Sequence, residues 1–199
     1  MEVLDAKTAY NFLRMRRSIR NFTPELVSEE KMKQLLDIAR YAPTAANSQG
    51  LYYIVVSDRE LIKKITDCVA DWMQEEIDNN SPRRRYFRKV LEVYRDRGVD
   101  IIGRNAKQLV FALARRLNVT GVSNCEQAWA YVELYAPTLG LGTTIMGFIE
   151  TCARADYAPL RELLQVPQKQ VIVGTLLVGY PKYKYNRLVD RQHLKVEFR

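Results

Sequence analysis

Residues 171–178 form the run that most limits how this chain can fold. The run is apolar throughout except for Gly174 and Thr175, and several of its side chains are β-branched. A strand without alternation between apolar and polar residues is covered on both of its faces. The sequence therefore predicts a central strand of a sheet, with other elements packed on both sides of it.

Helices and strands alternate along the rest of the chain, without a low-complexity linker or a detectable repeat. Ser28 can cap a helix that Pro43 ends. Short aromatic and β-branched runs predict a buried strand at 51–56 and another strand at 109–114, and residues 143–148 are expected to be extended. Capping and apolar spacing predict the other helices, at residues 61–72, 83–94, 123–139 and 159–164. Strands separated by helices of unequal length predict an α+β sandwich, with helices around one sheet.

Two regions depart from this pattern. Residues 71–98 are rich in charge and are broken by Pro82, and they are expected to form a lid that is too short to have a core of its own. Residues 194–198 alternate between apolar and charged side chains, which is typical of an edge strand or of a strand exchanged with another chain. The length of 199 residues and the lack of a low-complexity linker predict that residues 1–199 form a single domain.

The composition limits the possible functions. The chain of 199 residues is 47% hydrophobic, and its formal charge of +8 is compatible with a nucleic acid, an acidic membrane or an anionic cofactor as partner. Three separated cysteines indicate neither a disulfide framework nor a thiolate metal site. The single histidine, His193, argues against a Ser-His-Asp enzyme and against a multi-histidine metal centre.

The sequence also gives an expectation about location. The acidic N-terminus lacks the basic and apolar segments of a secretory signal, and no run approaches the ~20 apolar residues of a membrane span. Scattered cysteines without a pairing pattern are typical of proteins from reducing compartments. The protein is therefore expected to be cytoplasmic, with no membrane partner.

A cluster of cations near the N-terminus is the first candidate binding site. Arg16, Arg17, Ser18 and Arg20 place four phosphate-competent side chains within five residues. Guanidinium groups bind phosphate oxygens through paired and permanently charged donors. Taken alone, such a cluster is also typical of a solvated turn at the end of a helix.

Three further segments could contribute to a site, although each also has an ordinary structural explanation. The polar residues at 44–49 follow a helix end, where they can satisfy the local backbone. Gly140, Gly142 and Gly147 allow the close approach of a flat ligand, but their spacing is not that of a dinucleotide-binding loop. The tail at 180–187 interleaves aromatic and basic residues, which suits either single-stranded nucleic acid or a phosphate.

Four segments together carry a family resemblance. They are RRSIRNF at 16–22, APTAANSQ at 42–49, GLGTTIMGF at 140–148 and VGTLLVGYP at 173–181. In this order and spacing they resemble the FMN-dependent nitroreductases. The resemblance implies an α+β sandwich with helices around a central mixed, mainly antiparallel sheet, an intertwined homodimer, and two FMN sites shared between its subunits.

The resemblance also implies a chemistry. Members of the family bind FMN non-covalently, take a hydride from NADH or NADPH and pass it to a small-molecule electron acceptor in a ping-pong cycle. Because the cofactor carries the difficult chemistry, no catalytic side chain of the protein is required. Nitroaromatic, quinone or related electron-poor compounds are the expected acceptors, and no nucleic acid is expected as a partner.

The same resemblance assigns roles by position. Arg16, Arg17 and Ser18 match residues that hold the FMN phosphate and ribityl chain, and Arg20 matches a cation near the pyrimidine edge of the flavin. Two late arginines are candidates for phosphate contacts, first Arg187 and second Arg191. The other subunit is expected to supply four residues, Pro43, Thr44, Ala45 and Asn47. The loop whose backbone lies against the flavin, with an N–H directed at N5, corresponds to Thr144, Ile145, Met146 and Gly147.

Two departures from the family leave alternatives open. Tyr185 stands where many members have a basic residue, so the phosphate would depend more on Arg17 and Arg187. Residues 71–98 do not align with the family, which leaves the acceptor open. The alternatives are a specialised branch, such as a reductive dehalogenase or a flavin-destroying enzyme, and a flavin-binding protein without turnover. A nucleic-acid-binding module is the alternative from another class, motivated by the net charge and by the arginines at 83–85.

Overall fold

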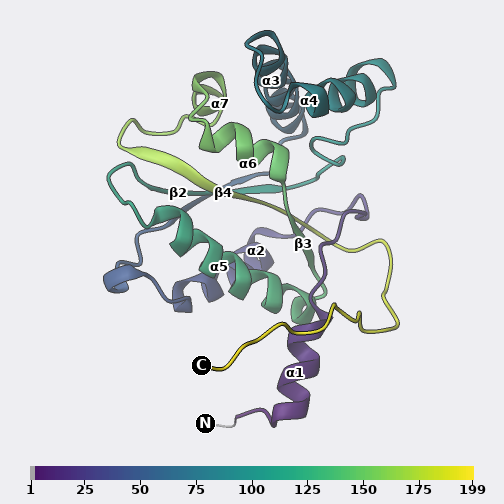
Figure 1. The fold of residues 1–199 in the computed structure, drawn as a ribbon, viewed down its shortest axis with the longest axis vertical. Helices are drawn as coiled ribbons and strands as arrows, with labels where there is room; N and C mark the ends of the chain where they lie inside the picture. The colour runs from purple at the N-terminus through teal and green to yellow at the C-terminus, as the bar shows by residue number, and fades with distance from the viewer. Residues whose placement is uncertain (1–2) are drawn as a thin grey trace.

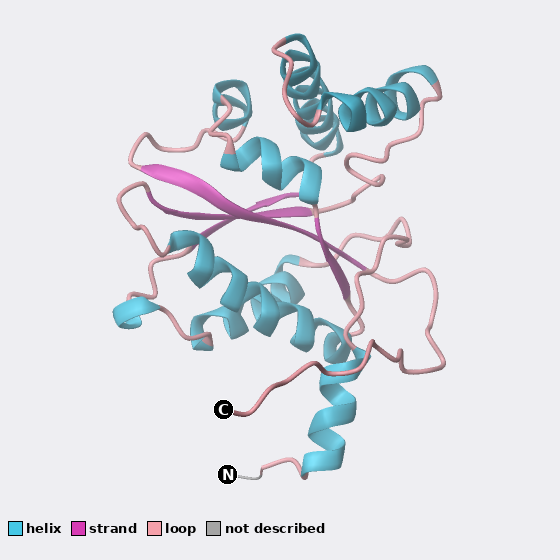
Figure 2. Cartoon of the chain, viewed as in Figure 1, coloured by secondary structure: helices cyan, strands magenta, loops and turns pink. Residues whose placement is uncertain are grey.

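The computed structural model of this protein describes residues 3–199, and a four-stranded sheet forms its centre (Figures 1 and 2). The strands are β1 (Tyr52–Val56), β2 (Leu109–Arg115), β3 (Gly142–Ile145) and β4 (Gln170–Gly179), in the spatial order β1-β2-β4-β3. Every pairing between these strands is antiparallel. β4 lies between β2 and β3, so the prediction of a central strand at 171–178 is confirmed.

Helices cover both faces of the sheet (Figure 1). On one face lie α2 (Glu29–Asp37) and α5 (Gly121–Tyr135). On the other face lie α3 (Arg59–Asp78), α4 (Arg84–Leu91), α6 (Gly147–Arg154) and α7 (Ala158–Leu163). The helix α1 (Ala6–Met15) projects from the body, close to the C-terminal segment. The predicted α+β sandwich, with helices around one sheet, is confirmed.

The residues of β2 alternate between two hydrophobic cores. Its odd-numbered residues from Leu109 to Leu113 pack with α3, α4 and α6, and its even-numbered residues from Val110 to Ala114 pack with α2 and α5. Each of these side chains is at most 1% exposed. Because both faces of the strand are covered from Leu109 to Ala114, these positions are all apolar, which explains the continuous apolar run in the sequence.

The strand β1 is more exposed than the sequence indicates. It pairs only with β2 and lies at one edge of the sheet, where Tyr52 and Val55 are 58% and 40% exposed. Aromatic and β-branched residues are common both in buried strands and on half-covered ones. The residue types therefore identify the strand correctly, but the expectation that residues 51–56 are buried is wrong.

Two other segments differ from expectation. β3 ends at Ile145 and α6 begins at Gly147, so the stretch 143–148 is extended only in its first half. Residues 194–198 do not pair with a strand anywhere in the described part of the chain. Their alternation of apolar and charged residues is therefore not explained by an edge strand of the same chain.

The region predicted to be a lid is packed on the main body. Residues 71–78 belong to α3, and η3 (Glu92–Asp96) continues α4 as a π-helical turn. Phe87 of α4 is 2% exposed and packs on Trp72 of α3, with their ring centres 5.4 Å apart. α4 is thus anchored over α3, and the closing of this region over a ligand stays a prediction.

Candidate functional site

The arginine cluster lies along the free edge of β3. Ile19 donates its backbone N–H to the carbonyl of Thr143 at 2.8 Å, and Ser18 forms a parallel bridge with the same residue. Gly142 makes this approach possible, because a Cβ there would lie 2.7 Å from an atom of the Ile19 side chain. Residues 16–20 are thus fixed against the sheet by their backbone, and their arginine side chains are not needed to hold them there.

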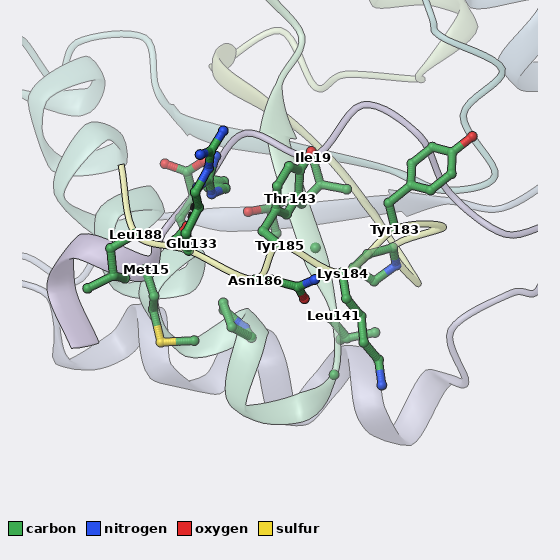
Figure 3. Close-up of a pocket in the computed structure, with 16 residues that line it drawn as sticks. Met15, Ile19, Glu133, Leu141, Thr143, Tyr183, Lys184, Tyr185, Asn186 and Leu188 are labelled. Atoms are coloured by element: carbon green, nitrogen blue, oxygen red, sulfur yellow. Dashed lines mark hydrogen bonds between the residues drawn. The ribbon is translucent and has the colours of Figure 1, made fainter. Parts of the chain in front are cut away.

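A cavity of about 540 Å³, the first cavity, opens beside this edge (Figure 3). Three cations line it, Arg17 from the N-terminal segment and Lys184 and Arg187 from the C-terminal tail. The Arg17 guanidinium lies 4.4 Å from the ring centre of Tyr185 and donates to the carbonyl of Arg187 at 2.6 Å. Three cations around one cavity suit a phosphate ester. The structure therefore brings Arg17 and Arg187 together at one cavity, and their contact with a phosphate stays a prediction.

Arg16 has a different partner. Its Nη1 lies 3.5 Å from Oε1 of Glu133, an α5 residue in the wall of the first cavity whose side chain is 11% exposed. Burial raises the pKa of the Glu133 carboxyl, and the charge of Arg16 and a hydrogen bond with Thr143 oppose that rise. In this chain Arg16 therefore neutralises a carboxylate beside the candidate phosphate site.

A second cavity, of about 550 Å³, lies at the C-terminal end of β3. Ile145, Met146 and Gly147 line one part of it, and Arg20 also borders it. Ile145 is 44% exposed although it is apolar, and a Cβ on Gly147 would meet no atom within 4 Å. An apolar strand end beside open space suits a flat ring. Thr144, the remaining residue of the predicted loop, is buried in β3.

The loop between β3 and α6 is held in place by β4. Oγ1 of Thr175 in β4 donates to the carbonyl of Met146 at 3.2 Å, and the N–H of Thr175 donates to Oε2 of Glu150 in α6 at 3.3 Å. Phe148 and Thr151, from the first turns of α6, also line the second cavity. Because the N–H groups at a helix start lack partners within the helix and carry partial positive charge, this wall favours the electron-rich edge of a ring.

The strand β3 connects the two cavities. Thr143 lines the first cavity and Met146 lines the second, and three residues of extended chain span ~10 Å. A ligand with an anionic group at one end and a flat ring at the other matches this arrangement. FMN has that form, with a ribityl chain between its phosphate and its ring, so the residues present fit non-covalently bound FMN.

The residues predicted to come from another subunit lie elsewhere. They are Pro43, Thr44, Ala45 and Asn47. They precede β1, at the sheet edge opposite to β3. Ala46 and Asn47 have left-handed φ angles of 52° and 49°, and Asn124 of α5 accepts the N–H of Ala45 at 3.1 Å. Such strain persists only where the surroundings enforce it. Within one chain, this turn reaches neither cavity.

The second late arginine also lies outside both cavities. Beyond Arg187 the tail runs back along α1, where Nη2 of Arg14 donates to the carbonyl of Val189 at 3.0 Å. Arg191 is exposed, and its backbone N–H bonds to Oδ1 of Asp190 within the tail. The structure therefore places Arg187, and not Arg191, at the candidate phosphate site.

The thiols of this protein are protected from reaction. Burial raises the pKa of Cys68 to about 11 and that of Cys125 to about 12, so both stay protonated at neutral pH.

Between residues 3 and 199, no cluster of three or more His, Cys, Asp or Glu residues is arranged to hold a metal ion. No helix in that range combines the length and the apolar composition that crossing a membrane requires.

Some residues of the two cavities were not found from the sequence. Glu133 lies within a helix and has no motif around it. Arg83 and Arg104 line the second cavity, but in the sequence they are indistinguishable from solvated surface charges. The run of arginines after Pro82 was the one feature that indicated an anionic partner in this region. Lys184 belongs to the aromatic and basic tail, whose composition did indicate a phosphate.

The chain is similar to known proteins over most of its length. The nitroreductase NfnB of Mycolicibacterium smegmatis is 27% identical over 197 residues, a match that covers 88% of this chain and 83% of that protein. The FMN reductase (NAD(P)H) of Bacillus subtilis is 28% identical over 172 residues, covering 83% of this chain and 62% of that protein. A crystal structure of a nitroreductase with bound FMN from Bacteroides fragilis covers 95% of this chain and 98% of its own, with a TM-score of 0.73 and 16% identity.

The family comparison is more direct than these pairwise likenesses. The model of the nitroreductase family matches residues 13–180. This range includes the arginine cluster, the turn before β1, and all four strands. The match spans most of the chain, and the chain therefore belongs to the nitroreductase family.

Proposed function

We propose that this protein is an FMN-dependent oxidoreductase that transfers a hydride from NADH or NADPH to nitroaromatic, quinone or related electron-poor acceptors. One observation carries the proposal. β3 runs from a cavity with three cations to a cavity with an exposed apolar strand end, at a spacing that suits the phosphate and the ring of one FMN. The names of the family relatives, a nitroreductase and an FMN reductase, support the same class of reaction.

In this proposal, the first cavity binds the phosphate of FMN and orients the rest of the cofactor. Arg17, Lys184 and Arg187 balance the charge of a phosphate, and paired guanidinium donors fix the direction in which the rest of the molecule leaves it. Arg16 keeps Glu133 from repelling that phosphate. The cavity therefore sets the position of the ring without touching it.

The second cavity holds the reacting partners. When bound, FMN supplies the two-electron chemistry, in which a hydride is accepted from one substrate and given to the next. Arg20 and the start of α6 place positive charge beside the ring, which favours added electron density there. A nitroaromatic compound, NAD(P)H and a proton would give a nitroso compound, NAD(P)⁺ and water. Because donor and acceptor would use the same cavity in turn, a ping-pong order is expected.

We infer that the working unit is a homodimer with each FMN site shared between two subunits. The turn at 43–47 lies at the opposite sheet edge from both cavities, so it can complete a site only on another copy of the chain. α1 presents apolar side chains to solvent, with Tyr10 63% and Leu13 55% exposed, and Leu194 and Phe198 of the tail are exposed as well. Apolar surface of this extent is typical of an interface.

The proposal is tested by loading the purified protein with FMN. We expect yellow protein that NADH or NADPH bleaches without oxygen and that nitroaromatic or quinone acceptors reoxidise. A colourless protein that takes up no FMN and oxidises NAD(P)H with none of these acceptors overturns the proposal. Product analysis separates nitro reduction from dehalogenation and from flavin destruction, and FMN uptake without turnover would indicate a flavin-binding protein.

A further inference from the structure

The second cavity has cations that the proposed cofactor does not require. Arg83, at the start of α4, and Arg104, in the loop before β2, line it together with Arg20. Across residues 3–199, none of these three guanidinium groups forms an ion pair with a carboxylate. Three such cations around one cavity create a positive potential that attracts an anion.

Arg83 reaches the cavity next to two aromatic side chains. Tyr86, one turn further along α4, lies 5.8 Å from Phe148 between ring centres, and both rings line the cavity. The buried contact between Phe87 and Trp72 anchors α4 in this position. An aromatic ligand could therefore pack on these rings while an anionic group attached to it meets Arg83.

Arg104 comes from a constrained turn. The φ angles of Arg104 and Asn105 are 53° and 52°, in the left-handed region that residues with a side chain rarely adopt. Asp100 holds the turn with both carboxylate oxygens, which accept the N–H of Gly103 at 2.6 Å and that of Asn105 at 2.8 Å. A strained turn that places a cation in the wall of a cavity is typical of a binding site.

We propose that this cavity selects, among the acceptors of the proposed oxidoreductase, single-ring aromatic compounds that carry a carboxylate, with Arg83 and Arg104 as specificity-determining residues. This inference rests on the proposed function. The arginines border the same cavity as Ile145 and Gly147, so an anion meets them only when it is attached close to the reacting ring. The two oxygens of a carboxylate also match the guanidinium fork. In a nicotinamide dinucleotide a ribose separates the ring from the phosphates, which places those anions further out.

Calorimetric titration of the FMN-loaded protein with benzoate and with benzamide tests the inference without turnover. The two compounds have the same shape and differ in charge. The three arginines are exposed, so solvent screens each contact, and we expect benzoate to bind on the order of 10-fold more tightly. R83Q and R104Q should each remove most of this preference. R85Q is the matched control, because it removes the same charge two residues further along, outside the cavity wall, and all three arginines are exposed.

Turnover gives a second measurement. The ratio of kcat/KM for 4-nitrobenzoate to that for 4-nitrobenzamide should fall in R83Q and R104Q. The kcat/KM for an uncharged quinone, measured beside it, shows how far each substitution affects turnover in general. R85Q should leave both quantities at the wild-type values. The neutral quinone thus reports on the rest of the catalytic cycle in each variant.

Three results would overturn the inference. Wild-type protein that binds benzoate and benzamide equally has no such preference, and an equal loss in all three variants would indicate a general effect of net charge. Variants that lose the use of NADPH but not of NADH, and keep the carboxylate preference, would assign the arginines to the phosphate of the donor. With any of these three results, a protein that still takes up FMN and oxidises NAD(P)H with a neutral quinone would retain the proposed function and lose only the inferred carboxylate preference.

Discussion

Arg17 connects the two chain segments that form the first cavity, because its guanidinium contacts both Tyr185 and the carbonyl of Arg187. We expect R17A to weaken FMN binding on the order of 10- to 100-fold, since a charged donor to the phosphate is lost. R17K should have an intermediate effect, because it keeps the charge and loses the planar fork. Quenching of FMN fluorescence measures the affinity. R40A breaks an exposed ion pair with Asp37 and controls for the charge, and equal affinities of R17A and R40A would contradict the prediction.

Glu133 should make the stability of the protein depend on pH. Burial raises the pKa of its carboxyl above the ordinary value of 4.5. Between these two pKa values the folded protein binds more protons than the unfolded chain, so this contribution to stability is lost as the pH rises.

The variant E133Q lacks this titration. We therefore expect the free energy of unfolding of the wild type to fall relative to that of E133Q as the pH increases from about 4.5. Urea unfolding of both proteins at one protein concentration, at a series of pH values up to 8, gives the comparison. Curves that stay parallel over this range would show that Glu133 has an ordinary pKa.

The chemistry of the arginine cluster could be predicted from the sequence, because four phosphate-competent side chains lie within five residues. The different partners of Arg16 and Arg17 could not. Glu133 is 117 residues from Arg16 in the sequence, and only the packing of α5 beside β3 brings the two together. Whether Ser18 contacts a phosphate stays a prediction, since its backbone position is fixed here and its ligand contact is not.

The contact between β3 and the N-terminal segment leaves no space for a side chain at position 142. A Cβ on Gly142 would lie 2.7 to 2.8 Å from two atoms of Ile19. We expect G142A to lower the free energy of unfolding by about 1–3 kcal/mol, and to weaken FMN binding because residues 16–20 are displaced from β3. Urea unfolding and FMN titration measure the two effects.

A double-mutant cycle provides the control for this contact. I19A removes Cγ1 and Cγ2 of Ile19 and keeps its Cβ, which would lie 2.8 Å from a Cβ at position 142. Because part of the overlap is removed, G142A should cost less in the I19A background than in the wild type. If the losses in the free energy of unfolding caused by G142A and by I19A were additive, a side chain at position 142 would not overlap with Ile19. In that case the position of the arginine cluster would depend on other contacts.

The central strands were predictable because burial on both faces leaves a continuous apolar run, as in β2 and β4. The start of α6 was not, because Gly147 and Phe148 carry no capping signal and continue the residue types of the strand. The role of α4 was only partly predictable. Its apolar stripe gave the helix, but the contact of Phe87 with Trp72 depends on the folded arrangement of α3.

The alternation of helices and strands predicted an α+β sandwich around one sheet, and the described chain has that form. The patterns in the sequence did not predict how two chains assemble. The turn at 43–47 and the two cavities lie at opposite edges of one sheet, so only a second chain could bring them together. No pattern within one chain reports on a contact between two chains. The expectation of a shared site therefore comes from the family resemblance, and a direct test of it is available.

The test combines two defective chains in one dimer. R17A damages the cavity side of a site, and N47A damages the turn that a second chain would supply. Each homodimer should therefore bind FMN weakly at both sites. In the heterodimer, the intact cavity of the N47A chain meets the intact turn of the R17A chain, so one of the two sites should regain wild-type affinity while the other carries both defects.

A site built within one chain gives a different result from the same mixture. If the turn acted within its own chain, each chain would carry its own defect, and neither site of the heterodimer would bind FMN tightly. If the turn took no part in the site, the N47A homodimer would bind FMN as tightly as the wild type. Chains with two different tags, purified through both tags and titrated with FMN, distinguish the outcomes. Half of the full occupancy at wild-type affinity, together with weak binding by both homodimers, requires that the turn act across the dimer, because no arrangement confined to single chains can produce an undamaged site from two chains that are each defective alone.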